Sequence, residues 1–128
     1  MSLFMDKEIL LFNGATATGT PTSPFCAIDW QHVVLTLASS GSANFTIKVK
    51  GSTQDTPPDF SAAASVTNRW EYMQLKDLAD GSTVAGATGV SYAGADAVRM
   101  FEVNINRVKR ISATITARSA GAITLSAI

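Results

Sequence analysis

Strict alternation of apolar and polar residues recurs along this chain and limits what it can fold into. In the segment 44–52, Phe45, Ile47 and Val49 fall on one side of an extended chain, and Thr46 and two lysines fall on the other. A period of two is typical of an antiparallel strand with one face in a core and one in water. Three more segments share this period: 100–106, 111–117 and 123–127.

Further segments are rich in strand-forming residues, although their register is less clear. These are 8–12, 25–29, 33–38, 70–78 and a short one at 90–93. Between the strands, turn-forming residues stand at 39–42, 80–82 and 119–121, and the last of these is short enough for a hairpin. Pro57 and Pro58 open a longer loop that runs through the alanines at 62–64, where one helical turn could form.

Short strands spaced by turns, with no amphipathic helix between them, predict an all-β fold. We expect a single-domain antiparallel β-sandwich or jelly-roll-like barrel with about eight short strands. The 128 residues suit one domain over 1–128, in which 1–24 could form an N-terminal arm and loop. Such an arm either joins the sheet of a neighbouring subunit or forms the first strand of its own sheet.

Charge argues against several classes of partner. Ten basic and ten acidic residues give a formal net charge of zero, whereas a nucleic-acid-binding domain normally has a basic surplus. A local cluster of Arg107, Lys109 and Arg110 fits either a solvated strand entry or a phosphate site. The apolar runs are too short to suggest a signal peptide or a membrane span. We therefore expect no nucleic-acid partner and no membrane association.

Residues suited to catalysis are scarce. The chain has one histidine, His32, and one cysteine, Cys26, which we interpret as a half-exposed structural residue and a small core residue. These two cannot supply a zinc site without carboxylates. Asp77 and Asp80 lack the spacing of a calcium loop, although a calcium site built from separate loops stays open. The sequence thus predicts no enzyme, no catalytic residue, no metal and no cofactor.

Aromatic and apolar side chains offer two alternative binding surfaces. They could anchor a protein interface, or some of them could stack against a sugar. A third interpretation is that 70–78 is an ordinary core strand with two covered faces. The interface candidates are Leu3, Phe4, Ile9, Leu11, Trp70, Tyr72, Met73 and Leu75. The sugar-stacking candidates are Trp30, Trp70, Tyr72 and Tyr92.

The order of elements from residue 44 to 128 resembles a known class of protein. The segments that carry this likeness are 45–52, 67–72, 77–82, 89–90, 99–104 and 119–121. In layout and composition they resemble small virion accessory proteins of tailed bacteriophages and prophages, of the capsid-decoration, head-fibre or tail-accessory kind. No single motif among them is diagnostic.

This resemblance implies a β-sandwich or jelly-roll-like subunit that forms homo-oligomers, often trimers, and attaches to a viral capsid or tail protein. It also implies assembly into virions in the bacterial host cytoplasm, and it transfers no catalytic residue. The leading hypothesis is thus a non-enzymatic structural subunit of a phage or prophage particle. The alternative hypothesis is a carbohydrate-binding β-sandwich module that uses exposed tryptophan and tyrosine.

Overall fold

The computed structural model describes residues 8–20, 25–26, 32–105 and 108–128, and within these ranges it contains nine strands and no helix. All the strand pairings are antiparallel, which confirms the all-β prediction. No helix in the described part of the chain is long and apolar enough to cross a membrane. The strands are β1 (Ile9–Ala15), β2 (Phe25–Cys26), β3 (His32–Ser52), β4 (Glu71–Tyr72), β5 (Leu75–Asp77), β6 (Thr83–Val84), β7 (Val90–Ala93), β8 (Val98–Asn104) and β9 (Arg110–Ala127).

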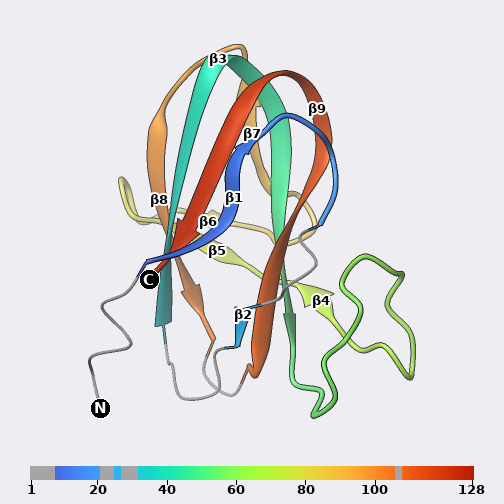
Figure 1. The fold of residues 1–128 in the computed structure, drawn as a ribbon. Coiled ribbons are helices and arrows are strands. Elements are labelled where there is room, and N and C mark those ends of the chain that lie inside the picture. The colour runs from blue at the N-terminus through green and yellow to red at the C-terminus, as the bar shows by residue number, and fades with distance from the viewer. Residues whose placement is uncertain (1–7, 21–24, 27–31, 106–107) are drawn as a thin grey trace.

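Two long strands, β3 and β9, form the centre of the molecule. They pair along most of their length, from Leu35 opposite Ala127 to Ser52 opposite Arg110. Both strands arch over in the same region, so that the ribbon they form folds back on itself (Figure 1). The two halves of the ribbon then face each other, which gives the sandwich-like arrangement.

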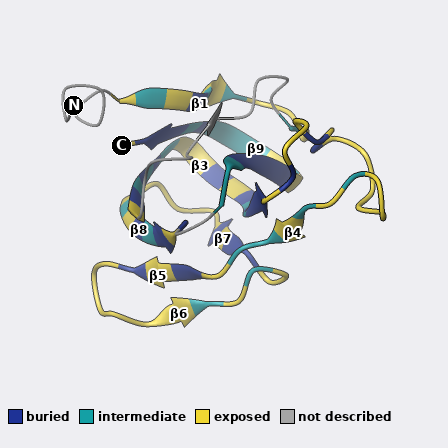
Figure 2. Ribbon diagram, turned by 90° about the horizontal axis from the view of Figure 1, so that it is seen from below, coloured by how far each residue is buried: buried dark blue, intermediate teal, exposed yellow. Residues whose placement is uncertain are grey.

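Shorter strands extend each half of this ribbon. The N-terminal half of β3 and the C-terminal half of β9 belong to a layer with the order β1-β9-β3-β8-β5-β6. In the other half, β2 pairs with β9, while β4 and β7 pair with β3. Figure 2 shows that buried residues concentrate on β3, β8 and β9, whereas β6 and most loops are exposed.

A single apolar core fills the space between the two halves. Alternate residues of each long strand point into it, as the period of two predicts. The core side chains with almost no exposed surface include Val33, Leu35, Leu37, Phe45, Ile47, Val49, Phe101, Ile111, Ile115, Ile123 and Leu125. Burying side chains of this size supplies the main driving force for folding.

The predicted turns at 39–42 and 119–121 are not turns between separate strands. The structure continues β3 and β9 through them, and both strands bend there. Gly41 and Gly121 have backbone φ angles of 76° and 83°, and Ser42 has a φ of 54°. These left-handed conformations let a pair of strands change direction together. The turn-forming residues at 39–42 and 119–121 therefore mark the place where one continuous two-stranded ribbon bends.

Other predicted strands are present in the structure, some of them with different bounds. β7 occupies 90–93 as predicted, whereas the segment 70–78 is divided into β4 and β5. Of 25–29 only β2 lies in the described ranges. The loop from 53 to 70 has turns near the alanines at 62–64 but no helix.

The N-terminal segment belongs to the sheet of its own chain. β1 pairs with β9, from Ile9 opposite Ala127 to Ala15 opposite Ile123, with irregularities between these pairs. This is the arrangement of a first strand rather than of an arm given to a neighbour. The outer edge of β1 forms one end of the layer order.

Candidate functional site

A pocket of about 520 Å³ lies beside β4, where the 53–70 loop returns to the sheet. Its wall combines aromatic, apolar and polar side chains, which is the usual composition of a ligand pocket. Gly51 helps to shape it, because a Cβ at this position would come within 2.2 Å of the Met73 sulfur. The other lining residues include Ser52, Arg69, Trp70, Glu71, Tyr72 and Val108.

Trp70 is held in this wall by three contacts. Its indole N–H donates a hydrogen bond to the carbonyl of Ala62 at 2.9 Å. The ring of Tyr72 meets it edge to face, with centroids 5.2 Å apart and planes inclined at 72°. The ammonium of Lys50 lies 4.2 Å from the Trp70 ring centroid, a favourable cation–π distance. Trp70 therefore fixes the loop to the sheet as well as bordering the pocket.

Lys50 is an almost fully buried cation, with 6% of its surface exposed. Its ammonium donates a hydrogen bond of 2.6 Å to the carbonyl of Phe60, which is also buried. Burial lowers the pKa of the Lys50 ammonium below its ordinary value, and the carboxylate of Asp59 partly opposes this effect. The buried charge thus ties β3 to the 53–70 loop directly behind Trp70.

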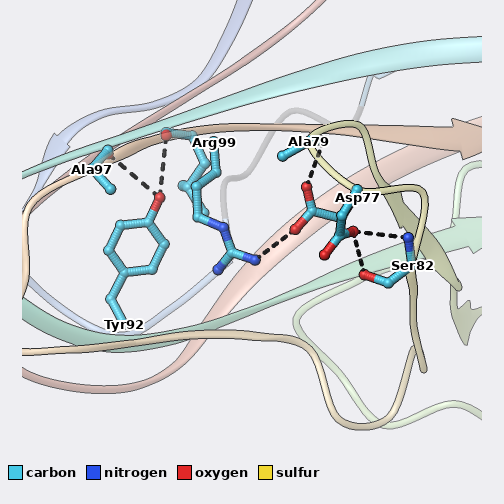
Figure 3. Close-up of polar contacts among 8 residues, drawn as sticks. Asp77, Ala79, Ser82, Tyr92, Ala97 and Arg99 are labelled. Carbon is cyan, nitrogen blue, oxygen red and sulfur yellow. Dashed lines mark hydrogen bonds and ion pairs between the residues drawn. The ribbon is translucent and has the colours of Figure 1, made fainter.

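Of the three sugar-stacking candidates in the described part of the chain, two lie together. Trp70 and Tyr72 are neighbours, but the 72° angle between their rings means that they form no flat platform. Tyr92 is 5% exposed and stacks on Phe45 at a centroid distance of 4.6 Å. Its hydroxyl lies within 3.4 Å of the carbonyls of Leu37 and Ala97 in the interior (Figure 3). Trp30 lies outside the described residues.

The interface candidates are also divided by the structure. Leu11 and Leu75 are buried in the core, because the inward positions of β1 and β5 fall on them. Ile9 and Met73 are partly buried and pack against the same core. Leu3 and Phe4 lie outside the described residues. Leu11 and Leu75 therefore belong to the core and are not available to a partner.

Several outward positions that sequence reasoning passed over carry exposed large apolar side chains. Val98 and Met100 on β8 are 70% and 46% exposed, and Leu10 on β1 is 50% exposed. The pattern that could have indicated them is visible in 98–103. There, Val98 and Met100 alternate with the inward Phe101 and Val103, so both faces of the strand carry apolar residues.

Arg99 and Asp77 form the least exposed ion pair in the described part of the chain. Arg99 reaches from β8 to the end of β5, and its guanidinium donates to the Asp77 carboxylate at 2.9 Å (Figure 3). The other oxygen of this carboxylate accepts the amide N–H of Ala79 at 2.9 Å. The guanidinium also lies 4.9 Å from the ring centroid of Phe101. The ion pair therefore joins β8 to the turn that follows β5.

Other polar candidates are engaged in local structure. The Asp80 carboxylate accepts the amide and hydroxyl of Ser82 at 2.9 and 2.7 Å. His32 Nδ1 lies 3.9 Å from a Glu102 carboxylate oxygen on the protein surface. Among the described residues, no three His, Cys, Asp or Glu side chains lie together as metal ligands.

The basic cluster contacts the start of the 53–70 loop. Lys109 forms an ion pair with Asp55, whose pKa this contact lowers. The Arg110 guanidinium donates to the carbonyls of Gln54 and Asp55, each at 3.2 Å. These contacts correspond to the strand-entry interpretation of the cluster. Arg107 lies outside the described residues.

Comparison with known proteins gives a likeness of fold. No known family model matches the chain, and a search of curated proteins finds no match. Among solved structures, the chain resembles the crystal structure of the SPBc2 prophage-derived protein YomS, with a TM-score of 0.68. The match covers 94% of this chain and 88% of that protein, at 8% sequence identity. The chain therefore has the fold of a prophage-derived protein, whose name states no activity.

Proposed function

We propose that this chain is a non-enzymatic structural subunit of a phage or prophage particle, a decoration or accessory protein. It acts by forming homo-oligomers, with a trimer favoured, and by attaching to a capsid or tail protein. The observation that supports this most is the fold shared with a prophage-derived protein over 94% of the chain. Assembly in the cytoplasm of the bacterial host, followed by incorporation into virions, completes the proposal.

The use made of polar side chains also supports a scaffold role. The ion pair between Arg99 and Asp77 fastens a turn to β8, and Lys50 fastens the 53–70 loop to β3. Within that loop, the Asn68 amide donates to the carbonyls of Asp59 and Ala63 at 2.8 and 3.1 Å. Buried or paired polar groups of this kind rigidify a surface. A rigid surface suits a subunit that must fit a repeating lattice.

The first test of the proposal is the mass of the protein in solution. We expect light scattering on a sizing column, at about 150 mM salt, to give a trimer or a larger closed ring. A strict monomer at high protein concentration would contradict the homo-oligomer. Attachment is tested on particles purified by density gradient from the host that carries the gene. Peptides of this chain should be found in the particle fraction and not only in the unassembled protein.

A second candidate function, sugar binding, is favoured by one observation, the pocket bordered by Trp70 and Tyr72. The hydroxyl and charged groups of this pocket could bind the hydroxyls of a sugar, while an aromatic side chain covers the apolar face of the sugar ring. A glycan array tests this, with Trp70→Ala as the variant and the exposed Val66→Ala as its control. Binding that survives Trp70→Ala, or no binding at all, would exclude this pocket as a sugar site.

A further inference from the structure

One face of the molecule carries most of the large apolar side chains that are exposed in the described ranges. Six large hydrophobic residues are exposed in the described ranges, and five of them project from the same layer, on the side away from the core. We call this the outer face. The sixth, Val66, lies in the 53–70 loop and is 85% exposed. The five on the outer face are Leu10, Leu78, Val98, Met100 and Ile128.

Strand register shows that these side chains are neighbours. Residues paired across antiparallel strands point to the same face of the sheet. Leu10 is opposite Ser126, Ser126 is opposite Thr36, and Thr36 is opposite Met100. Leu78 continues this row, because its amide donates to the Met100 carbonyl at 3.0 Å. One row therefore crosses the layer from β1 to the end of β5.

The rows on either side complete the outer face. On one side, Ile128 and Val34 exchange backbone hydrogen bonds of 2.9 and 3.0 Å, so their side chains share this face. On the other side, Ala38 is opposite Val98 on β8 and opposite Thr124 on β9. The residues between the five apolar ones on β9 and β3 are thus small or uncharged, and the charged border begins at Glu102 on β8, opposite Val34. Such a surface loses little when water is removed from it.

Charges of both signs lie at the border of the outer face. Lys76 on β5 is opposite Glu102 on β8, and His32 is adjacent to Glu102. Around a three-fold axis of identical chains, a border with both signs can place the acid of one copy against the base of the next. The formal net charge of zero leaves little general repulsion between copies. The border therefore permits pairing of acid and base between copies.

The size of the outer face is also suitable. At their exposed fractions, the five side chains present on the order of 400 Å² of apolar surface, which is the size of a functional patch on a monomer. A stable interface takes about 800 Å² from each partner, and Val34, Thr36 and the border residues enlarge the contact toward that value. We propose that a second copy of this chain docks on the outer face. This inference rests on the homo-oligomer proposed above and names the surface that forms it.

The experiment compares two variants with the wild-type chain. Val98→Lys combined with Met100→Lys places charges at the centre of the outer face, where both side chains are exposed in the single chain. Val66→Lys makes the same kind of change at an exposed large apolar residue of the 53–70 loop, outside this face. Light scattering over a range of concentrations gives the mass, and circular dichroism with thermal melting checks the fold. Val98→Thr with Met100→Thr serves if the lysine variant fails to fold, because threonine keeps the strand preference.

We expect the wild-type chain and Val66→Lys to associate equally, and the double lysine variant to associate about 100-fold more weakly. If the double variant keeps the wild-type mass, the outer face is not the docking surface, while the homo-oligomer itself still holds. If the wild-type chain is a monomer at every concentration, the homo-oligomer fails as well. The two failures are thus distinguished by the wild-type mass.

Discussion

At the bend of β9, Gly121 lies against the backbone of β3 and leaves no room for a side chain. Its φ is 83°, and a Cβ there would lie 2.6 Å from the Ser40 carbonyl oxygen and 2.6 Å from the Ala43 Cα. Both neighbours are backbone atoms of β3, which cannot move aside without opening the bend. We predict that Gly121→Ala lowers the free energy of unfolding by about 3 kcal/mol or more.

A second glycine supplies the matched control for this prediction. Gly81 has a φ of 76° and no atom within 4 Å of the position of a Cβ. Gly81→Ala should therefore cost only the left-handed backbone strain, about 1 kcal/mol. Urea denaturation measures both variants. Equal losses would show that the close approach of the two bends contributes nothing to stability.

The buried ammonium of Lys50 predicts a dependence of stability on pH. Burial lowers its pKa in the folded chain below the ordinary value of 10.5, so the unfolded chain binds this proton more tightly. The free energy of unfolding should therefore rise with pH in the window just below 10.5. Burial raises the pKa of Tyr92 above its ordinary 10.0, which lowers stability only from that pH upward.

Urea denaturation between about pH 8 and pH 9, where a tyrosine is at most about a tenth ionised, keeps the measurement clear of Tyr92. We expect Lys50→Met to flatten the rise of the free energy of unfolding over this range. The same slope in the variant and the wild-type chain would show that Lys50 is not the titrating group responsible.

Among the connecting elements, the turn between β5 and β6 depends most on one side chain. Asp77 receives the Arg99 guanidinium on one carboxylate oxygen and the Ala79 amide on the other, and its own carbonyl accepts the Gly81 amide. We predict that Asp77→Ala loses about 2 kcal/mol of stability, because two partly buried donors lose their acceptor. Asp77→Asn keeps one neutral acceptor and should lose about half as much.

Thermal unfolding of both variants tests this order. The exposed pair of Asp55 with Lys109 gives the control, since Asp55→Ala should change the stability little. A loss for Asp77→Asn as large as that for Asp77→Ala would mean that the charge matters and the turn hydrogen bond does not.

The strands and the turn at 80–82 were largely predictable from the sequence, whereas the connections at 39–42 and 119–121 were not. Alternation located the core residues Phe45, Ile47 and Val49, because a half-buried strand requires that pattern. A glycine-containing stretch such as 119–121, however, has the same composition in a hairpin and in a bent strand. Which of the two forms is decided by the partner strand, and for β9 this is β3, far away in the sequence.

The candidate binding residues were less predictable for the same reason. Register decides which side chains of a strand point outward, and a shift of one residue exchanges the two faces. At the N-terminus the sequence indicated Ile9 and Leu11 as interface residues, whereas pairing with β9 turns Leu10 outward. The pairing of Trp70 with Lys50 likewise depends on the return of the 53–70 loop, which has no local pattern.

For the molecule as a whole, association through the outer face predicts a stability that depends on protein concentration. Self-association stabilises only the folded chain, so a 100-fold increase in concentration should raise the Tm by about 5 °C. Val98→Lys with Met100→Lys should abolish this dependence and leave the Tm at low concentration unchanged. Differential scanning calorimetry at two concentrations measures it. A Tm that is independent of concentration in the wild-type chain would contradict self-association.

The position of β9 between β1 and β3 also has a consequence for how the protein is made. Residues 110–127 form the central partner of strands that the ribosome produces much earlier, and β3 has most of its pairings with them. Nascent β1 and β3 therefore remain without their partner β9, and with apolar residues exposed, until β9 has left the ribosomal exit tunnel. Contacts so distant along the chain are typical of slow folding. In this interval the unpaired strands make the growing polypeptide prone to aggregation, and a chaperone that covers them would favour correct folding.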